Sequence, residues 1–183
     1  MEAQRAYAVQ LQVDAETEAQ VKDVWRRMAE AGLSTYLHES SATPHVTLGI
    51  HDDMDVETAQ DRLTALASRT PAFAFRFNSI GIFGQDACVV FLAPVMTQSL
   101  WTLHRAVHAA LEDCASPSWE HYCEPRWVPH CTLAMDLEPE HLPAAINHAR
   151  TFALPHDGVF EAFGIIEFRP VRHVFSKNLQ RPN

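Results

Sequence analysis

The 183-residue sequence predicts an α+β fold made of two similar β-α-β-α-β halves around a pseudo-twofold axis. Three observations lead to this prediction. Strand-like and helix-like segments alternate twice in the same order, a Pro-His-x-Thr-Leu string occurs once in each half, and similar strings surround Gly81 and Gly164. We place the first repeat at about residues 6–86 and the second at about 87–179. No linker separates them, so we expect residues 1–183 to form a single bilobal domain with a central groove.

The first half begins with an apolar, β-forming strand at 6–13. Asp14 can cap a helix that Gly32 is suited to end. The apolar face of that helix has helical spacing: Val21, Val24, Trp25 and Met28. A polar loop at 38–43 leads into a strand at 44–50, Asp55 can cap a second helix, and a third strand covers 73–83 before a turn at 84–86.

The second half repeats this order. A buried strand at 87–93 is followed by a helix that Thr97 can cap, and a loop leads into a strand at 129–135. Pro139 suits the first turn of the next helix. A strand at 159–168, a turn at 169–170 and a last strand at 171–175 complete the chain.

The chemistry is predicted to lie in the paired strings Pro44-His45-Val46-Thr47-Leu48 and Pro129-His130-Cys131-Thr132-Leu133. Side chains two positions apart on a strand share a face, so each histidine projects together with its threonine. A pseudo-twofold axis that brings these strands together would place two imidazoles and two hydroxyls in one groove. We therefore predict His45, Thr47, His130 and Thr132 as the catalytic set.

Such a set suits displacement at phosphorus. One imidazole can deprotonate the attacking oxygen while the other protonates the leaving oxygen, because both titrate near neutral pH. The threonine hydroxyls can donate hydrogen bonds to the non-bridging phosphate oxygens. This chemistry requires no metal ion and no cofactor. The residues alone leave open which histidine is the base and which the acid.

The tandem His-x-Thr motifs resemble those of the two-histidine (2H) phosphoesterase superfamily, and within it the 2′-5′ RNA ligase-like group. The resemblance runs from Tyr7 to about Leu179 and is closest at Trp127-Val128-Pro129-His130-Cys131-Thr132-Leu133-Ala134. It implies a bilobal fold and metal-independent action on 2′,3′-cyclic or 2′-5′ phosphodiesters of nucleotides or RNA ends. It also implies catalytic roles for His45 and His130, with Thr47 and Thr132 binding phosphate.

Five further residues are candidates for substrate binding. Tyr36 and Tyr122 precede the two motifs at similar distances and can line the groove. Arg126 could contact phosphate, and Trp127 and Phe83 could stack on a base. Each also has a structural interpretation, because a loop arginine is often simply solvated and an aromatic residue often packs in the core.

The composition limits the kinds of substrate and binding partner that the protein can have. The formal net charge is −9, so the chain is not expected to track long nucleic acid, which needs a broad basic surface. We expect a small nucleotide or an RNA end as substrate. No apolar run is long enough to span a membrane and no signal peptide is evident. We therefore expect a cytoplasmic monomer with four free cysteines, without a membrane partner.

Three alternatives remain open, the first of them implied by the resemblance and the other two by the residues. The chain could act as a 2′-5′ RNA ligase, or it could be a nucleotide-binding module with little catalytic power. A zinc-binding structural protein is the third, because His121, Cys123, His130 and Cys131 cluster in sequence. Adjacent residues of a strand point to opposite faces, which argues against His130 and Cys131 sharing one ion.

Overall fold

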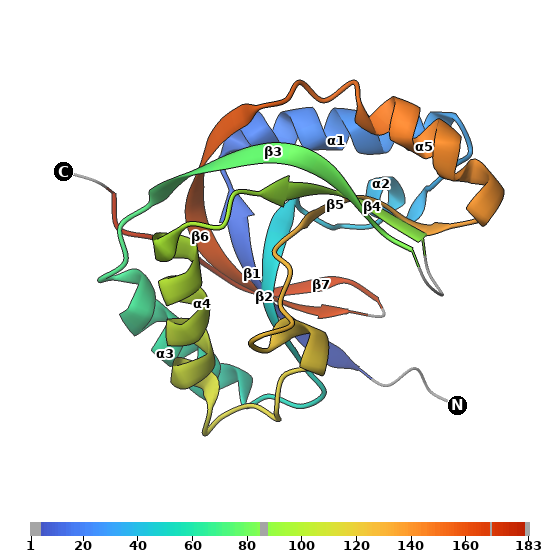
Figure 1. Cartoon of the computed structure of the whole chain (residues 1–183). Coiled ribbons are helices and arrows are strands. Elements are labelled where there is room, and N and C mark those ends of the chain that lie inside the picture. The colour runs from blue at the N-terminus through green and yellow to red at the C-terminus, as the bar shows by residue number, and fades with distance from the viewer. Residues whose placement is uncertain (1–4, 85–87, 169, 182–183) are drawn as a thin grey trace.

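The computed structural model describes residues 5–84, 88–168 and 170–181, which form one twisted antiparallel sheet flanked by helices (Figure 1). The strands are β1 (Ala6–Val13), β2 (His45–His51), β3 (Phe73–Phe83), β4 (Cys88–Pro94), β5 (Cys131–Leu137), β6 (His156–Phe168) and β7 (Arg172–Asn178). The helices are α1 (Ala15–Glu30), α2 (Tyr36–Glu39), α3 (Val56–Ala67), α4 (Gln98–Leu111) and α5 (Leu142–Ala149), with short 3₁₀ turns at Glu120–Tyr122 and Pro139–His141.

The strand order is β2-β1-β6-β3-β4-β5, and β7 pairs with the part of β6 that β3 leaves free. This order has twofold symmetry. If each strand of the first predicted repeat is exchanged with its counterpart in the second (β1 with β4, β2 with β5, β3 with β6), the same order is obtained in reverse. The third strands cross over: β6 completes the sheet of β1 and β2, while β3 pairs with β4. The sheet is therefore the arrangement that a duplicated β-α-β-α-β chain gives when its halves exchange their last strands.

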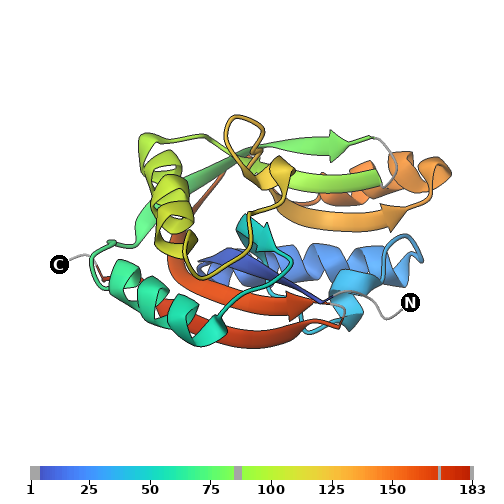
Figure 2. The same cartoon turned by 90° about the horizontal axis from the view of Figure 1, so that it is seen from below.

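The helices also pair across the repeats. Helix α1 packs against α5 and both contact β5, whereas α3 packs against α4 beside β6, β7 and β2. Figure 2 shows the two pairs at opposite ends of the molecule. Each pair contains one helix from each half, so the pseudo-twofold relation that orders the strands also orders the helices.

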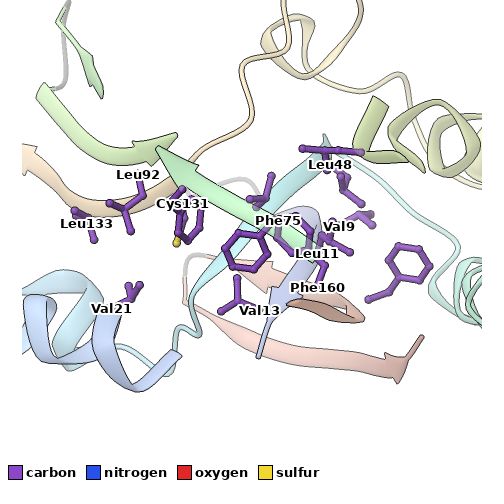
Figure 3. Packing of buried hydrophobic residues seen from close by; sticks show 14 of the residues in the cluster. Val9, Leu11, Val13, Val21, Leu48, Phe75, Leu92, Cys131, Leu133 and Phe160 are labelled. Atoms are coloured by element: carbon purple, nitrogen blue, oxygen red, sulfur yellow. The ribbon is translucent and has the colours of Figure 1, made fainter. Parts of the chain in front are cut away.

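The core lies between the sheet and these helices. Figure 3 shows Val21 of α1 below Leu92 and Leu133, and Leu11 near Phe75 and Phe160, all members of one buried cluster. These side chains are buried, as the apolar faces of the predicted elements require. The strands that carry the histidine motifs thus turn one face toward a packed core and leave the other for chemistry.

Most predicted elements are present, with shifted ends. Asp14 caps α1 through its Oδ1, which accepts from the Thr17 backbone N–H at 2.8 Å, and Gly32 follows the helix with a positive φ of 67°. The predicted loop at 38–43 begins inside the short helix α2. Residues 85–87 of the predicted turn and strand, and Arg169 of the last turn, lie outside the described residues.

Among the helices of the described ranges, none combines the length and the apolar character that crossing a bilayer requires.

Candidate active site

The first motif lies at the start of β2, where His45 opens the strand. Antiparallel pairing with β1 sets His45 opposite Gln12 and Thr47 opposite Gln10. Strand alternation directs His45 and Thr47 to one face, while Val46 and Leu48 are fully buried beneath them. His45 itself is half-buried.

The second motif is arranged in the same way on β5. His130 immediately precedes the strand and Thr132 pairs with Phe91 of β4. Cys131 and Leu133 are buried on the opposite face. His130 and Thr132 are both half-buried, so the second pair faces away from the core like the first.

Each imidazole is held by the backbone two residues earlier. Nδ1 of His45 lies 2.6 Å from the Thr43 carbonyl oxygen, and Nδ1 of His130 lies 2.7 Å from the Val128 carbonyl oxygen. A carbonyl can only accept, so Nδ1 carries the proton in both rings. Nε2 is therefore the nitrogen left for proton transfer in each, and the two repeats fix the same tautomer.

The two motifs lie near each other in the fold. Strands β2 and β5 are the two ends of the sheet order, yet they contact each other because the sheet curves round. The backbone of His45 lies near enough to the thiol of Cys131 to oppose the rise in its pKa that burial causes. His130 lies near enough to His45 for its positive form to lower the pKa of His45.

Burial sets the charge state of both rings. It lowers the pKa of His45 to about 4, against the opposing effect of the Thr43 carbonyl. Burial also lowers the pKa of His130, again opposed by a backbone carbonyl, that of Val128. Both imidazoles are thus predominantly neutral at pH 7, which is the state that a general base needs. The general acid must be the histidine of the pair that has the higher pKa.

The surroundings of His45 are polar. The Gln10 side-chain nitrogen lies 3.2 Å from His45 Nε2, and Ser176 of β7 donates to the Gln12 side-chain oxygen at 3.2 Å. Gly164 of β6 lies opposite Gln10, and a Cβ there would come within 2.6 Å of the Gln12 amide nitrogen. The glycine therefore leaves room for the glutamine side chains beside the site.

A third histidine approaches His45. His173 of β7 is exposed, its Nε2 donates to the Ser41 carbonyl oxygen at 2.6 Å, and its charged form lowers the pKa of His45.

The surroundings of His130 are aromatic instead. The centroid of its ring lies 4.9 Å from that of Phe83, 5.4 Å from Phe91 and 6.4 Å from Tyr122. Phe83 stacks on Phe91 at 4.3 Å, and Gly81 lies opposite Phe91 with no side chain in the way. The recurrence of Gly81 and Gly164 in the sequence thus has a physical reason, because each makes space for the neighbour of a site histidine.

Trp127 lies in the core and not in the site. It is 5% exposed, it stacks on His104 at 3.8 Å, and its indole N–H donates to the Thr47 carbonyl oxygen at 3.0 Å. Its predicted stacking on a base is therefore not supported, and it positions β2 instead. Trp25 of α1 does the same for the other motif, donating to the Thr132 carbonyl oxygen at 2.9 Å.

Two other predicted binding residues are placed on the surface. Arg126 is exposed and its guanidinium pairs with Glu120 at 2.7 Å. Tyr36 is 40% exposed at the start of α2. Neither shows a contact with His45 or His130 within the described ranges, whereas Phe83 and Tyr122 do reach His130.

Gln10, Gln12 and Phe91 are the site neighbours that sequence reasoning did not select. Gln10 and Gln12 alternate on an otherwise apolar strand, with the same two-residue spacing as His45 and Thr47. That spacing is a usable signal of a polar face. Phe91 carried no such signal, because its proximity to His130 depends on the pairing of β4 with β5.

The sequence cluster of His121, Cys123, His130 and Cys131 does not form a common site. Cys131 is fully buried, and burial raises the pKa of its thiol to about 12 while His130 faces the other way. In the parts of the chain that the structure describes, no three His, Cys, Asp or Glu side chains gather closely enough to hold a metal ion.

Known proteins resemble this chain in sequence and in structure. The sequence model of the 2′-5′ RNA ligase superfamily matches residues 13–169. A search of curated proteins gives no match.

Solved structures resemble the fold over almost its full length. TT0787 of Thermus thermophilus has a TM-score of 0.67 at 15% identity, over 97% of this chain and 100% of that protein. A protein described as a phosphoesterase has a TM-score of 0.63 at 19% identity, over 97% and 99%. E. coli LigT complexed with 3′-AMP has a TM-score of 0.61 at 16% identity, over 96% and 98%, and further LigT structures hold ATP, NADP⁺ or phosphate. The chain therefore has a LigT-like α+β fold.

Proposed function

Because the chain belongs to the 2′-5′ RNA ligase superfamily, we propose that it is a metal-independent phosphodiesterase that hydrolyses its substrate by two-histidine acid–base catalysis. Its proposed targets are the 2′,3′-cyclic phosphate or 2′-5′ phosphodiester bonds of nucleotides or RNA ends.

One observation carries the proposal. Two half-buried imidazoles from equivalent strands share a site, and in each the backbone holds Nδ1 so that Nε2 remains for chemistry. A purely structural pair would need neither the common tautomer nor the partial exposure of both residues. The arrangement matches the needs of a reaction in which one oxygen loses a proton as another gains one.

In the proposed reaction the histidines transfer protons and the threonines bind the phosphate. One imidazole takes a proton from water as the water oxygen attacks phosphorus, and the other gives a proton to the departing ribose oxygen. Thr47 and Thr132 flank these positions and donate to the non-bridging oxygens, where negative charge collects in the transition state. Holding the groups in place before substrate arrives lowers the barrier further.

The substrate is proposed to be small or terminal. LigT structures hold 3′-AMP, ATP and NADP⁺, which supports a nucleotide as the bound group here. Phe83 and Tyr122 beside His130 offer aromatic surface for a base or ribose. A net charge of −9 favours recognition of one or two phosphates by local donors over binding along a strand.

A substrate panel tests the proposal. Purified protein is assayed on 2′,3′-cyclic mononucleotides, short 2′-5′ oligoadenylates and RNA ending in a cyclic phosphate. We expect turnover that survives EDTA, and a loss of about 10²–10⁴-fold in kcat for His45→Ala or His130→Ala. His148→Ala on α5 is the matched control and should retain activity.

Two results would count against the proposal. One is full activity in the His45→Ala, His130→Ala double variant. The other is tight nucleotide binding by calorimetry with no turnover on any member of the panel, which would support a binding module.

A further inference from the structure

Helix α4 carries two histidines that the proposed reaction does not use. His104 and His108 are one helical turn apart, and the centroids of their rings are 4.4 Å apart. Nε2 of His104 lies 2.9 Å from the Tyr122 carbonyl oxygen, and Nε2 of His108 lies 2.9 Å from the Leu48 carbonyl oxygen. A carbonyl can only accept a hydrogen bond, so each ring carries a proton on Nε2 and donates it. The pair therefore holds β2, which carries the first motif, and the 119–127 segment that leads toward β5.

His104 contacts the 119–127 segment at two points. Besides its hydrogen bond to the backbone, its ring stacks on Trp127 at 3.8 Å with an angle of 14° between the planes. The Trp127 indole N–H donates to the Thr47 carbonyl oxygen, so this stack reaches the first motif. The next residue in the chain supplies the carbonyl that holds Nδ1 of His130. A change at His104 therefore affects the backbone beside both motifs.

Only a neutral His104 fits these contacts. Its Nδ1 is buried and has no hydrogen-bond partner in the described part of the chain. A proton on Nδ1 would place a positive charge inside the protein, beside a second imidazole. Burial, together with the charged form of His108, lowers the pKa of His104 to about 4, and the carbonyls of Tyr122 and Leu48 oppose this lowering only in part. The Leu48 carbonyl already accepts from His108, so a second donor would compete for it.

The charged groups around His104 do not compensate a positive ring. A cavity of about 230 Å³ beside it is lined by Arg105, His108, Cys123 and Glu124. The Glu124 carboxylate is already paired with the Arg105 guanidinium at 3.5 Å. Toward β2 the next titratable group is His51, and burial together with the charged form of His108 lowers the pKa of His51 as well. Acidification therefore charges neighbouring imidazoles that repel one another.

We propose that His104 is an acid-sensitive positioning residue. While it is neutral it holds the 119–127 segment against β2, and its protonation releases that segment. Release would move Tyr122 away from His130 and remove the Trp127 indole from the Thr47 carbonyl. The effect on catalysis rests on the phosphodiesterase function proposed above, whereas the release itself does not.

The direction of the pH effect follows from the lowered pKa. Release exposes the His104 ring to water, where its pKa returns toward the ordinary value of 6.5. The closed form therefore binds fewer protons than the released form. The stability that neutral His104 gives to the closed form is complete above about pH 6.5 and is lost as pH falls from about 6.5 to about 4. Over this range the released population rises by up to about tenfold per pH unit.

Hydrogen exchange in the unmodified protein is the first test and needs no substrate. Exchange is measured at pH 7, 6 and 5 and corrected for the intrinsic pH dependence of amide exchange. The Trp119 amide donates to the Ile50 carbonyl of β2 at 2.8 Å, and the Trp127 amide donates to the Cys123 carbonyl at 3.0 Å. Peptides that contain these amides should lose about tenfold or more of their protection between pH 7 and pH 5. Peptides of α1, which His104 does not contact, should lose much less.

A His104→Gln variant separates the charge from the contact. The glutamine amide can donate to the Tyr122 carbonyl as Nε2 does, but it takes up no proton in this pH range. The fall in protection of the 119–127 segment between pH 7 and pH 5 should therefore shrink to less than about threefold. His121→Gln is the matched control, because it makes the same substitution at an exposed position of the same segment. It should behave like the unmodified protein.

Three results would overturn the proposal. The first is an unchanged protection of the 119–127 segment in the unmodified protein down to pH 5. The second is a fall in the His104→Gln protein as large as that in the unmodified protein. The third is an equal loss of protection in α1, which would mean that acid unfolds the whole molecule rather than releasing one segment.

The outcome for the proposed function is separate. If acid releases the segment and no substrate of the panel is cleaved at any pH, the phosphodiesterase proposal fails while the role of His104 in holding the segment stands. If substrate is cleaved and the segment keeps its protection at pH 5, the role of His104 fails while the phosphodiesterase proposal stands.

Discussion

At the residue scale, burial of the two imidazoles determines the pH dependence of the proposed reaction. It lowers the pKa of both His45 and His130 below the ordinary value of 6.5. Activity falls as pH drops through the pKa of the base, which must be neutral, and as pH rises through that of the acid, which must be protonated. We therefore expect a bell-shaped kcat/KM profile with its maximum on the acid side of the ordinary histidine pKa, and a maximum above about pH 7.5 would contradict this.

A second residue-scale prediction concerns Gly81. A Cβ at this position would lie 2.3 Å from two ring atoms of Phe91, so the ring would have to move. Because Phe91 stacks on Phe83 and both contact His130, Gly81→Ala should lower kcat/KM and destabilise the fold by about 1–3 kcal/mol.

Urea unfolding and kinetics measure both effects of this change. Gly84→Ala is the matched control, because a Cβ there meets nothing within 4 Å. Equal stability and activity of the two variants would show that the position of Phe91 does not depend on the space that Gly81 leaves.

At the element scale, each motif strand is held by a tryptophan from the other repeat. Trp127 of the second repeat donates to Thr47, and Trp25 of the first donates to Thr132. Trp127→Phe keeps an aromatic ring but removes the donor from a buried carbonyl. We expect a loss of about 1–3 kcal/mol in the free energy of unfolding, together with a fall in kcat.

The same substitution elsewhere provides the comparison. Trp119 is partly exposed and its indole donates to Asp52, so Trp119→Phe should change stability by less than about 0.5 kcal/mol. Denaturant midpoints and kcat values of the two variants test whether the Trp127 indole stabilises and positions β2. If Trp127→Phe and Trp119→Phe have the same stability and the same kcat, the indole of Trp127 does not position β2.

The element scale also shows how far local pattern can predict a site. Strand alternation correctly placed the His-x-Thr motifs opposite buried Val46 and Cys131, because a two-residue period is visible in any short segment. Trp127 was a different case, since a base-stacking residue and a core residue have the same sequence pattern. Its partner is the carbonyl of Thr47 on a distant strand, and only folding brings the two together.

At the scale of the whole molecule, the acidic charge predicts how substrate length affects binding. A site that contacts one or two phosphates should lose less than about tenfold in affinity between about 50 and 200 mM salt. We expect similar KM values for a cyclic mononucleotide and for the same nucleotide at the end of an RNA of about 20 nucleotides. A much lower KM for the long RNA, with a steep salt dependence, would indicate an extended basic surface instead.

The α+β architecture was predictable at this scale because the duplication is visible in the sequence. The repeated order of elements and the matched Gly81 and Gly164 indicated a pseudo-twofold arrangement, and the strand order has that symmetry. The exchange of β3 and β6 between the halves was not predictable. A strand sequence records which face is apolar and does not record which partner supplies its hydrogen bonds.

That exchange fixes the order in which the protein can be assembled during synthesis. Strand β1 leaves the ribosome well before β6, one of its two partners, because strands β2 to β5 lie between them in the sequence. Gln10 gains its neighbour Gly164 only through this late pairing. The half of the site around His45 therefore has an uncovered sheet edge until β6 has been synthesised, so its folding depends on a long-range contact.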